Sequence, residues 1–517
     1  MRRRTFLSLT GTATGSLLLR PSAQIFSRSL LRSENRESDL LIDLVDAAMT
    51  QGAEYADARL LSTRAQTVQL RKDVVAQLTD VEDRGFLLRV FKNGGWASSA
   101  ISGAVEIHPR HVARQALQSA LTASQLSPVP FDPMHRPEQL TAAYATPMER
   151  DPFEVPLQEK IDFLREIATA PLTVQQIPHT VANLFLNRTD SDFFNSTQTR
   201  LRQTTTSLYQ NYALTAFSQA LKRMDSRSSP REAKAGGWEL LKEYSRSELD
   251  TLIQDVMKKL QAEALAEGSF DVVVDPTVMW DLITDTLLPH LDARRMLERD
   301  GARPGGRWLT PDMVGAAQIT SPALTLGWDN TLPGGLATCG WDDSGRPADS
   351  GTLIDQGKLL RIVGSDEIGG VPAHLAHTRS NSWRQPPHCS MPNIVLKSGG
   401  TKTLQRLIES VPNGILIRGR GSIITNPQRT IARIRPQMGW RIRAGEVTDM
   451  VRDFEIEVPV EKLWNSLGET GGPLTAITAG ELFPERCYPL WTQPFSVSTP
   501  AALFRALPVY SSTENAS

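Results

Sequence analysis

The sequence predicts an α+β protein, in which a smaller mixed α/β lobe precedes a larger, mostly antiparallel β-rich lobe. After Phe270 the sequence has mostly the pattern of strands and turns. Residues 181–222 are rich in Thr, Ser and Gln, which is typical of antiparallel strands with one solvated face. At roughly 100–200 residues per domain, 517 residues predict two or three lobes.

The first lobe begins with a predicted helix, because apolar residues recur at helical spacing over 40–49 and Gly52 lies where a C-terminal cap belongs. Strand-like sequence follows and reaches residue 91, and Asn93-Gly94-Gly95 then predicts the turn of a β-hairpin that continues at Trp96. A second helix is predicted after Pro109. These elements indicate a small mixed lobe.

A proline-rich connector interrupts this lobe at residues 126–156, which hold seven prolines and predict no core of their own. A helix is predicted from there to about Ala170, a loop at 225–237, and a helix with one apolar stripe at 248–267. Phe454, Ile456 and Val458 alternate with glutamates, which predicts a half-buried strand. We place the N-terminal domain at residues 35–235 and the C-terminal domain at 236–517.

Residues 1–34 have the pattern of a twin-arginine export signal and leader. Arg3-Arg4-Thr5-Phe6-Leu7 precedes a mildly apolar stretch diluted with glycine and threonine, and Arg20 follows. The alternative is a basic N-terminus of a cytoplasmic protein. The order of charged, apolar and small residues favours the signal, so we expect a periplasmic or otherwise exported protein with cleavage near Ala23.

The charge balance and the cysteines exclude several classes of protein. Fifty-six basic and 57 acidic side chains give a formal net charge of −1, so neither nucleic acid nor an anionic membrane is an expected partner. No run of about 18 apolar residues exists that would span a membrane. Cys339, Cys389 and Cys487 show neither a disulfide framework nor a zinc-finger spacing. Free thiols are favoured, with one disulfide as the alternative.

Five segments, in this order, resemble the TldD/PmbA family of zinc-peptidase-related proteins. They are Gly85–Trp96 (GFLLRVFKNGGW), Asp271–Asp285 (DVVVDPTVMWDLITD), Asp329–Leu360 (with DNTLPGG, DDSGRP and LIDQGKLL), Asn381–Asn393 (with Ser390 in place of the family's second Arg) and Leu463–Leu467 (LWNSL). The resemblance implies a two-domain subunit that pairs with itself or with a paralogue and encloses a chamber for peptides.

In active members of that family a helix carries HExxxH, in which two His bind zinc, the Glu activates a water molecule, and a distant Cys adds a ligand. With Asp275-Pro276 as the anchor, the first His position is Thr284, the Glu position is Asp285 and the second His position is Pro289. Threonine is a poor zinc ligand, and proline has no donor atom for a metal. The standard site therefore cannot form, and we expect no bound metal.

A relocated site is the alternative. Asp285 and His290 repeat the family's His-to-His spacing one residue later, Asp292 follows, and Cys487 is the best candidate for the cysteine ligand. On a regular helix Asp285 and His290 would lie about 140° apart, so a site there needs a distortion, which Pro289 would supply. In this case zinc would be the cofactor, and Asp285, at the position of the family's Glu, would be the catalytic base.

Three functions follow from these alternatives. The favoured one is an exported, catalytically inactive, PmbA-like subunit that binds a peptide or an unfolded polypeptide and forms a homodimer or a heterodimer with a paralogue. The second is an active metallopeptidase that carries out proteolysis with the relocated site. The third is a structural envelope protein.

Two further groups of residues are not expected to take part in a functional site. His374 and His377 are expected to be solvated, and Asp342-Asp343 is expected to form a turn.

Overall fold

The computed structural model describes residues 35–103, 107–126, 139–230, 233–241, 246–297, 308–365, 374–380, 382–482 and 493–512. The predicted export signal, residues 1–34, lies outside the described residues, and so does Cys487. No helix in the described ranges is long and apolar enough to cross a membrane.

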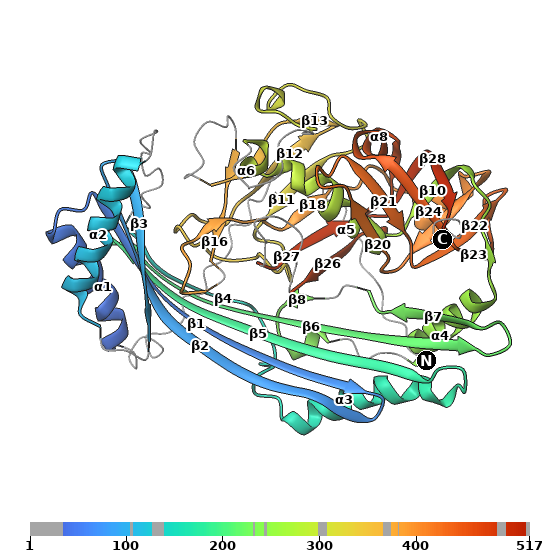
Figure 1. The fold of residues 1–517 in the computed structure, drawn as a ribbon, viewed down its shortest axis with the longest axis horizontal. Helices are drawn as coiled ribbons and strands as arrows, with labels where there is room; N and C mark the ends of the chain where they lie inside the picture. Colours follow the sequence, from blue (N-terminus) through green and yellow to red (C-terminus); the bar gives the residue numbers. More distant parts are fainter. Residues whose placement is uncertain are drawn as a thin grey trace, which may run out of the picture.

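A long, curved sheet forms the first lobe, with strand order β3-β2-β1-β5-β6-β4 and with β7 and β8 also paired to β6 (Figure 1). Its strands are β1 (Tyr55–Arg71), β2 (Val74–Lys92), β3 (Gly95–Ser102), β4 (Thr141–Ala145), β5 (His179–Asn195), β6 (Arg200–Ser218), β7 (Arg223–Ser228) and β8 (Lys234–Ala235). The β2–β3 hairpin turns at Asn93 and Gly94, both with positive φ, which confirms the predicted turn.

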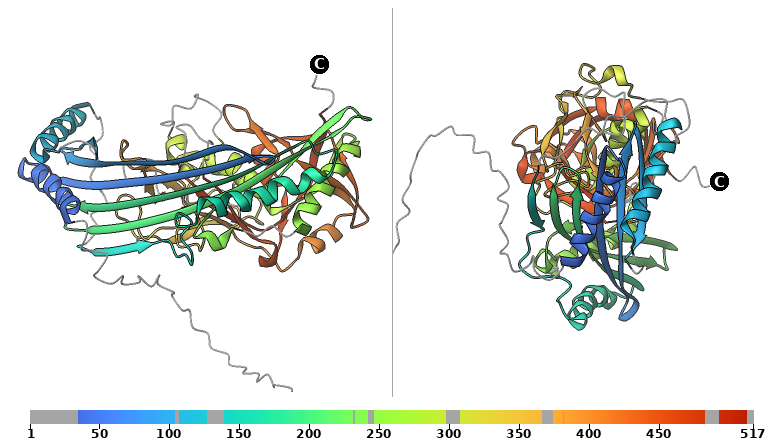
Figure 2. Two further views of the ribbon diagram at one scale, coloured as in Figure 1. Left: turned by 90° about the horizontal axis from the view of Figure 1, so that it is seen from below. Right: turned by 90° about the vertical axis from the view of Figure 1, so that its left-hand side faces the viewer.

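Helices cover the outer face of this sheet near its two ends (Figure 2). They are α1 (Asn35–Thr50), α2 (Pro109–Leu126), α3 (Leu157–Thr169) and α4 (Arg246–Gln261). Leu41, Leu44 and Ala48 of α1 are buried in one apolar cluster with strands β1 and β2, and the apolar face of α3 packs on β1 and β5 in a second cluster. These contacts confirm the helices predicted from apolar spacing.

The structure differs from the sequence prediction at three places in this lobe. Part of the proline-rich connector forms β4, which pairs in parallel with β6. The predicted loop at 225–237 contains β7 and β8, which pair antiparallel with the same strand. Helix α4 lies beyond residue 235, yet it packs against β6 and β7. Strand pairing supplied by the long strand β6 is the reason why sequence with weak strand signals becomes sheet.

A ten-stranded sheet and a six-stranded sheet build the second lobe. They confirm the predicted α+β class with mostly antiparallel strands. The first has the order β20-β21-β24-β28-β10-β19-β22-β23-β9, with β25 on β28, and the second has the order β13-β12-β11-β18-β27-β26. The first contains β9 (Glu263–Ala264), β10 (Gly268–Val274), β19 (Asn413–Arg418), β20 (Ser422–Thr425), β21 (Ile431–Arg435), β22 (Met438–Arg443), β23 (Glu446–Arg452), β24 (Phe454–Pro459), β25 (Leu467–Thr470) and β28 (Ala502–Ser511). The second contains β11 (Leu326–Asp329), β12 (Ser350–Asp355), β13 (Lys358–Leu359), β18 (Ile394–Leu396), β26 (Ile477–Glu481) and β27 (Phe495–Thr499).

Short elements complete this lobe. The strand pairs β14 (Ile362–Gly364) with β15 (His374–Ala376) and β16 (Thr378–Arg379) with β17 (His388–Cys389) lie outside the two large sheets. The helices are α5 (Pro276–Leu282), α6 (Ala293–Met296), α7 (Leu404–Glu409) and α8 (Val460–Asn465). Strands β10 and β19 pair in parallel beside α5, so the buried centre of the lobe directs the chain into that helix.

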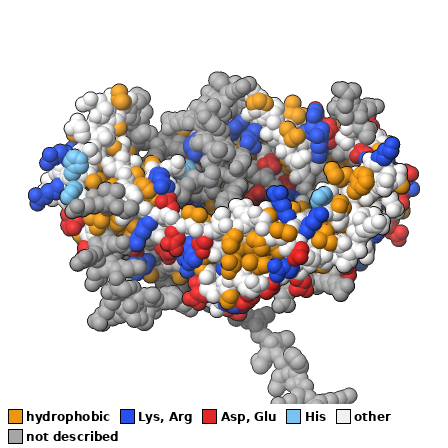
Figure 3. All heavy atoms as spheres, turned by 60° about the horizontal axis from the view of Figure 1, so that its bottom comes forward, with side chains coloured by type: hydrophobic (Ala, Val, Ile, Leu, Met, Phe, Trp, Pro, Cys, Tyr) orange, Lys and Arg blue, Asp and Glu red, His pale blue; other side chains and the backbone are white. Residues whose placement is uncertain are grey.

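The second lobe rests on the inner face of the long sheet, and polar contacts join the two (Figure 1). The side-chain oxygen of Gln203 on β6 accepts hydrogen bonds from the backbone N–H groups of Gly340 and Trp341, at 2.9 and 3.0 Å. Arg420 donates to the hydroxyl of Tyr209 at 2.8 Å. On the face viewed in Figure 3, acidic and basic side chains are interspersed, and hydrophobic side chains gather near the middle.

Candidate functional site

The segment that carries the candidate site begins with a well-capped helix. Asp275 follows β10 directly and is the N-cap of α5, and its carboxylate accepts the backbone N–H of Thr277 at 2.9 Å. Pro276 occupies the first helical turn, where a missing N–H costs nothing. The regular helix ends at Leu282 after only two turns. A π-turn then covers Ile283–Leu287, and a 3₁₀ turn covers Leu288–Leu291.

Local chemistry explains why this helix loses its regular hydrogen-bond pattern. The hydroxyl of Thr284 donates to the carbonyl of Trp280 at 2.9 Å, and that of Thr286 donates to the carbonyl of Leu282 at 2.6 Å. Such back-bonding competes with backbone N–H donors and bends helices. Pro289 then removes an N–H and crowds the preceding turn. The distortion expected at Pro289 is therefore present, and it begins about one turn earlier.

The positions that the family resemblance assigns to the metal ligands lie in the packed interior of the second lobe. Thr284 is 2% exposed, and its hydroxyl is engaged with backbone carbonyls. Pro289 is also buried, and Asp285 is half-buried. The indole N–H of Trp464 donates to the hydroxyl of Thr286 at 3.0 Å, and this hydrogen bond connects the π-turn to α8. Trp464 belongs to the tryptophan segment of the family resemblance.

His290 is a buried, neutral imidazole whose Nε2 is engaged. That nitrogen donates to the backbone carbonyl of Arg429 at 2.9 Å, and the ring packs edge-to-face on Trp308 with centroids 5.4 Å apart. Burial, together with the nearby charges of Arg295 and Arg429, lowers the pKa of His290 to about 4, although the hydrogen bond to the carbonyl of Arg429 opposes this shift. The histidine thus ties the 3₁₀ turn to the loop before β21.

Asp292 has a structural role in this arrangement. Its carboxylate caps α6 by accepting the N–H of Arg294 at 2.8 Å, and it forms an ion pair with the guanidinium of the same residue at 2.8 Å. Among the predicted site residues, Asp285, His290 and Asp292 lie on one short segment of the chain. His290 and Asp292 are engaged with other groups, while Cys487 lies outside the described residues.

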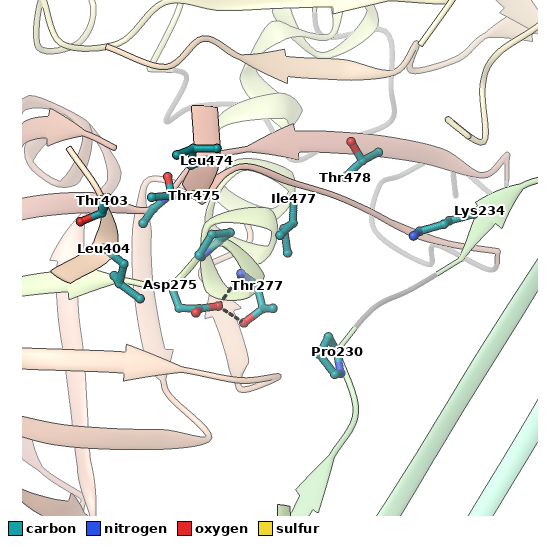
Figure 4. Close-up of a pocket in the computed structure, with 12 residues that line it drawn as sticks. Pro230, Lys234, Asp275, Thr277, Thr403, Leu404, Leu474, Thr475, Ile477 and Thr478 are labelled. Atoms are coloured by element: carbon teal, nitrogen blue, oxygen red, sulfur yellow. Dashed lines mark hydrogen bonds between the residues drawn. The ribbon is translucent and has the colours of Figure 1, made fainter. Parts of the chain in front are cut away.

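A cavity of about 560 Å³ opens at the start of the same helix, between the two lobes (Figure 4). Its lining comes from five separate parts of the chain: Pro230 and Lys234; Asp275, Pro276 and Thr277; Thr403 and Leu404; Leu474, Thr475, Ile477 and Thr478; and Ala501. Threonine hydroxyls and apolar side chains alternate around it, and Lys234 approaches from the long sheet. A mixture of apolar surface and a few polar groups is typical of ligand-binding pockets. Sequence reasoning missed this cavity, because no single segment contains it.

Two models of one protein family match this chain. The model described as the PmbA/TldA metallopeptidase C-terminal domain matches residues 267–510, and the model of domain 1 of the same metallopeptidases matches residues 56–120. Together they cover more than half of the chain. The chain belongs to the TldD/PmbA family.

Relatives and solved structures agree with this family. A protein named metalloprotease from Methanothermobacter thermautotrophicus is 24% identical over 425 residues, which cover 81% of this chain and 87% of that protein. One of the same name from Synechocystis is 22% identical over 79% of this chain and 85% of that protein.

Two crystal structures share the fold. A putative modulator of a DNA gyrase from Thermotoga maritima has a TM-score of 0.70 at 16% identity, covering 92% of this chain and all of that one. TldE from Thermococcus kodakarensis has a TM-score of 0.66 at 15% identity, covering 91% and 99%.

Zinc is the metal that the TldD/PmbA family implies, and the residues at its place in this chain do not fit it. A zinc site needs three or four donors at about 2.0–2.3 Å in tetrahedral arrangement. Here the Nε2 of His290 is engaged by a carbonyl, and the positive charges of Arg295 and Arg429 act on the same imidazole. Within the described ranges, no group of three His, Cys, Asp or Glu side chains is arranged to hold a metal ion.

Proposed function

We propose that this chain is an exported, catalytically inactive subunit of the TldD/PmbA family that binds peptides and pairs with itself or with a paralogue. The observation that supports the loss of catalysis is the segment after α5. Thr284 and Pro289 replace the two histidines, and a π-turn followed by a 3₁₀ turn replaces the regular helix. A peptidase of this class needs an ion that lowers the pKa of water to about 7 and stabilises the oxyanion.

Without that ion, Asp285 has no polarised water to deprotonate. The lost Lewis acid would have contributed several kcal/mol to stabilisation of the transition state. A carboxylate alone is a weak substitute, because peptide hydrolysis also needs charge stabilisation on the carbonyl oxygen. The substitutions therefore remove the function of the site even though an acidic residue is retained at the position of the base.

Metal content and peptidase activity test this part of the proposal. Natively purified mature protein is expected to contain much less than one zinc per chain by elemental analysis and to hydrolyse peptides no faster than a control preparation. Stoichiometric zinc with chelator-sensitive activity, lost in Asp285→Asn or His290→Ala, would overturn the proposal in favour of the relocated site. His179→Ala is the matched control, because His179 is exposed on β5 in the other lobe.

Peptide binding is supported by the cavity between the lobes, since a scaffold without a ligand needs no peptide-sized opening lined by hydroxyl and apolar groups. Leu474 on its rim is 94% exposed. Leu474→Asp is expected to weaken the binding of an unstructured peptide, measured by calorimetry, because it places a charge where apolar side chains would pack. Val447→Asp, at an exposed position on β23 outside the cavity, is expected to bind like wild type. Equal losses in both variants would count against this cavity.

Pairing is supported by the resemblance to a family whose subunits enclose a chamber together. Light scattering is expected to give twice the mass of the mature chain, or a complex with a co-purifying relative. A protein that remains a monomer of slightly less than the full-length mass of 57.0 kDa, with no relative bound, would remove this part of the proposal.

A further inference from the structure

A second cavity lies in the C-terminal lobe and shares no lining residue with the cavity between the lobes. Its volume is about 640 Å³, and its walls come from β11, β12, the loop that joins them, the residue before β14 and the chain at the end of β15 and directly after it. Trp328, Asn330, Cys339, Arg361 and His377 are among its lining residues. Polar groups dominate this lining, and they include His377, whose buried Nε2 has no hydrogen-bond partner among the described residues.

His377 lines this cavity and is only 2% exposed, which corrects the expectation that it is solvated. The side-chain oxygen of Asn330 accepts the N–H of Asn393, so the amide nitrogen of Asn330 faces the Nδ1 of His377, at 3.4 Å. Nδ1 is thus the acceptor, and the proton of the neutral ring is on Nε2. In the described part of the chain this buried Nε2 has no hydrogen-bond partner. A buried donor without an acceptor is costly, which makes it a marker of a ligand position.

Arg361 supplies a positive charge to the same cavity. It is exposed, and its guanidinium lies over the ring of Trp328 with 6.0 Å between the guanidinium carbon and the ring centroid. Among the described residues, its guanidinium forms one long hydrogen bond, of 3.4 Å, to the carbonyl of Thr352, and it forms no ion pair with a carboxylate. Trp328 is held in place because its ring covers Gly351 so closely that a Cβ there would lie 2.2 Å from it.

The carboxylates at this cavity are engaged elsewhere. Asp342 accepts the N–H groups of Ser344, Arg346 and Thr378 at 2.8, 2.9 and 3.1 Å, which is the turn that the sequence predicts. Asp349 accepts the indole N–H of Trp328 at 2.8 Å. Neither aspartate, therefore, satisfies His377 or pairs with Arg361.

We propose that this cavity binds a carboxylate, which accepts hydrogen bonds from His377 Nε2 and Arg361, while Trp328 packs against the apolar part of the ligand. A neutral imidazole donor together with a guanidinium fits the two oxygens of one carboxylate. The carboxylate is either the C-terminal end of a peptide or a small free acid. This inference goes beyond the proposed function and does not rest on it, because a small acid alone tests it.

Ligand-observed NMR titration of the full mature protein tests the inference with two matched pairs of probes: propionate with propionamide, and trialanine with trialanine amide. At least one acid is expected to bind, and its amide is expected to bind about tenfold more weakly, because the charge-assisted hydrogen bonds are lost. Binding of trialanine alone assigns the site to a peptide chain end, and binding of propionate as well assigns it to carboxylates in general.

Arg361→Gln is expected to weaken binding of the acid about tenfold, because one charge-assisted hydrogen bond is lost. The variant is expected to fold, because Arg361 is exposed. Arg406→Gln is the control: Arg406 is an exposed arginine on α7, outside this cavity. His377→Gln reports on the buried donor, and its thermal melt separates weaker binding from unfolding. The inference is overturned if neither acid binds at concentrations up to ~10 mM, if acids and amides bind equally, or if Arg361→Gln and Arg406→Gln behave alike. Peptide binding in the cavity between the lobes would stand unaffected by these outcomes.

Discussion

The π-turn after α5 depends on a hydrogen bond from a distant part of the chain, and replacing Thr286 by valine tests this dependence. Thr286 and Trp464 are both fully buried, and the indole N–H donates to the threonine hydroxyl at 3.0 Å. Valine has nearly the same shape as threonine but has no acceptor. The indole N–H would then be buried without a partner, which costs about 1–3 kcal/mol of the free energy of unfolding.

Two further variants separate this effect from packing. Thr286→Ser keeps the hydroxyl and loses one methyl group, so it is expected to cost only about 1 kcal/mol. Trp464→Phe removes the donor, so Thr286→Val made in that background is expected to cost less than in wild type. In a double-mutant cycle measured by urea unfolding, the coupling free energy between the two sites is then about 1 kcal/mol or more.

A coupling free energy near zero would refute this reasoning, because it would mean that the indole N–H gains nothing from Thr286. Equal losses in Thr286→Ser and Thr286→Val would refute it as well, because the hydroxyl would then contribute nothing beyond its volume. Far-UV circular dichroism of each variant checks that the fold is retained before the free energies are compared.

Three other predictions follow from the sequence and the contacts. Replacing Arg3 and Arg4 by lysine is expected to retain the precursor in the cytoplasm, as seen by fractionation and blotting, and export at the wild-type level would rule out the twin-arginine route. Burial lowers the pKa of His377 from 6.5 to about 3, so between these values the unfolded chain binds a proton that the folded chain does not. The free energy of unfolding should therefore decrease as the pH is lowered from about 6.5 to about 3, and it should decrease less steeply in His377→Gln. Gln203→Leu is expected to cost about 1–3 kcal/mol in urea unfolding, because the N–H of Gly340 loses its acceptor on the long sheet, and an unchanged midpoint would contradict that role.

The sequence by itself determined the elements whose cause is local. Helix α1 follows from apolar spacing, α2 and α3 were predicted after Pro109 and Pro156, and the β2–β3 turn follows from Asn93-Gly94. These signals act over a few neighbouring residues. The resemblance in the sequence also assigns the family's histidine positions to Thr284 and Pro289, a prediction that needs only an alignment anchor such as Asp275-Pro276.

Only the tertiary structure decided the features that join distant segments. The connector strand β4 exists because β6 offers it a partner, and α4 packs against the first lobe although it lies after residue 235. Trp464 reaches the π-turn across 178 residues of sequence, and His377 is buried by segments that its i, i+3 spacing from His374 gave no reason to expect. Hydrogen bonds and burial of this kind depend on which surfaces meet after folding, and a local sequence pattern carries no information about that meeting.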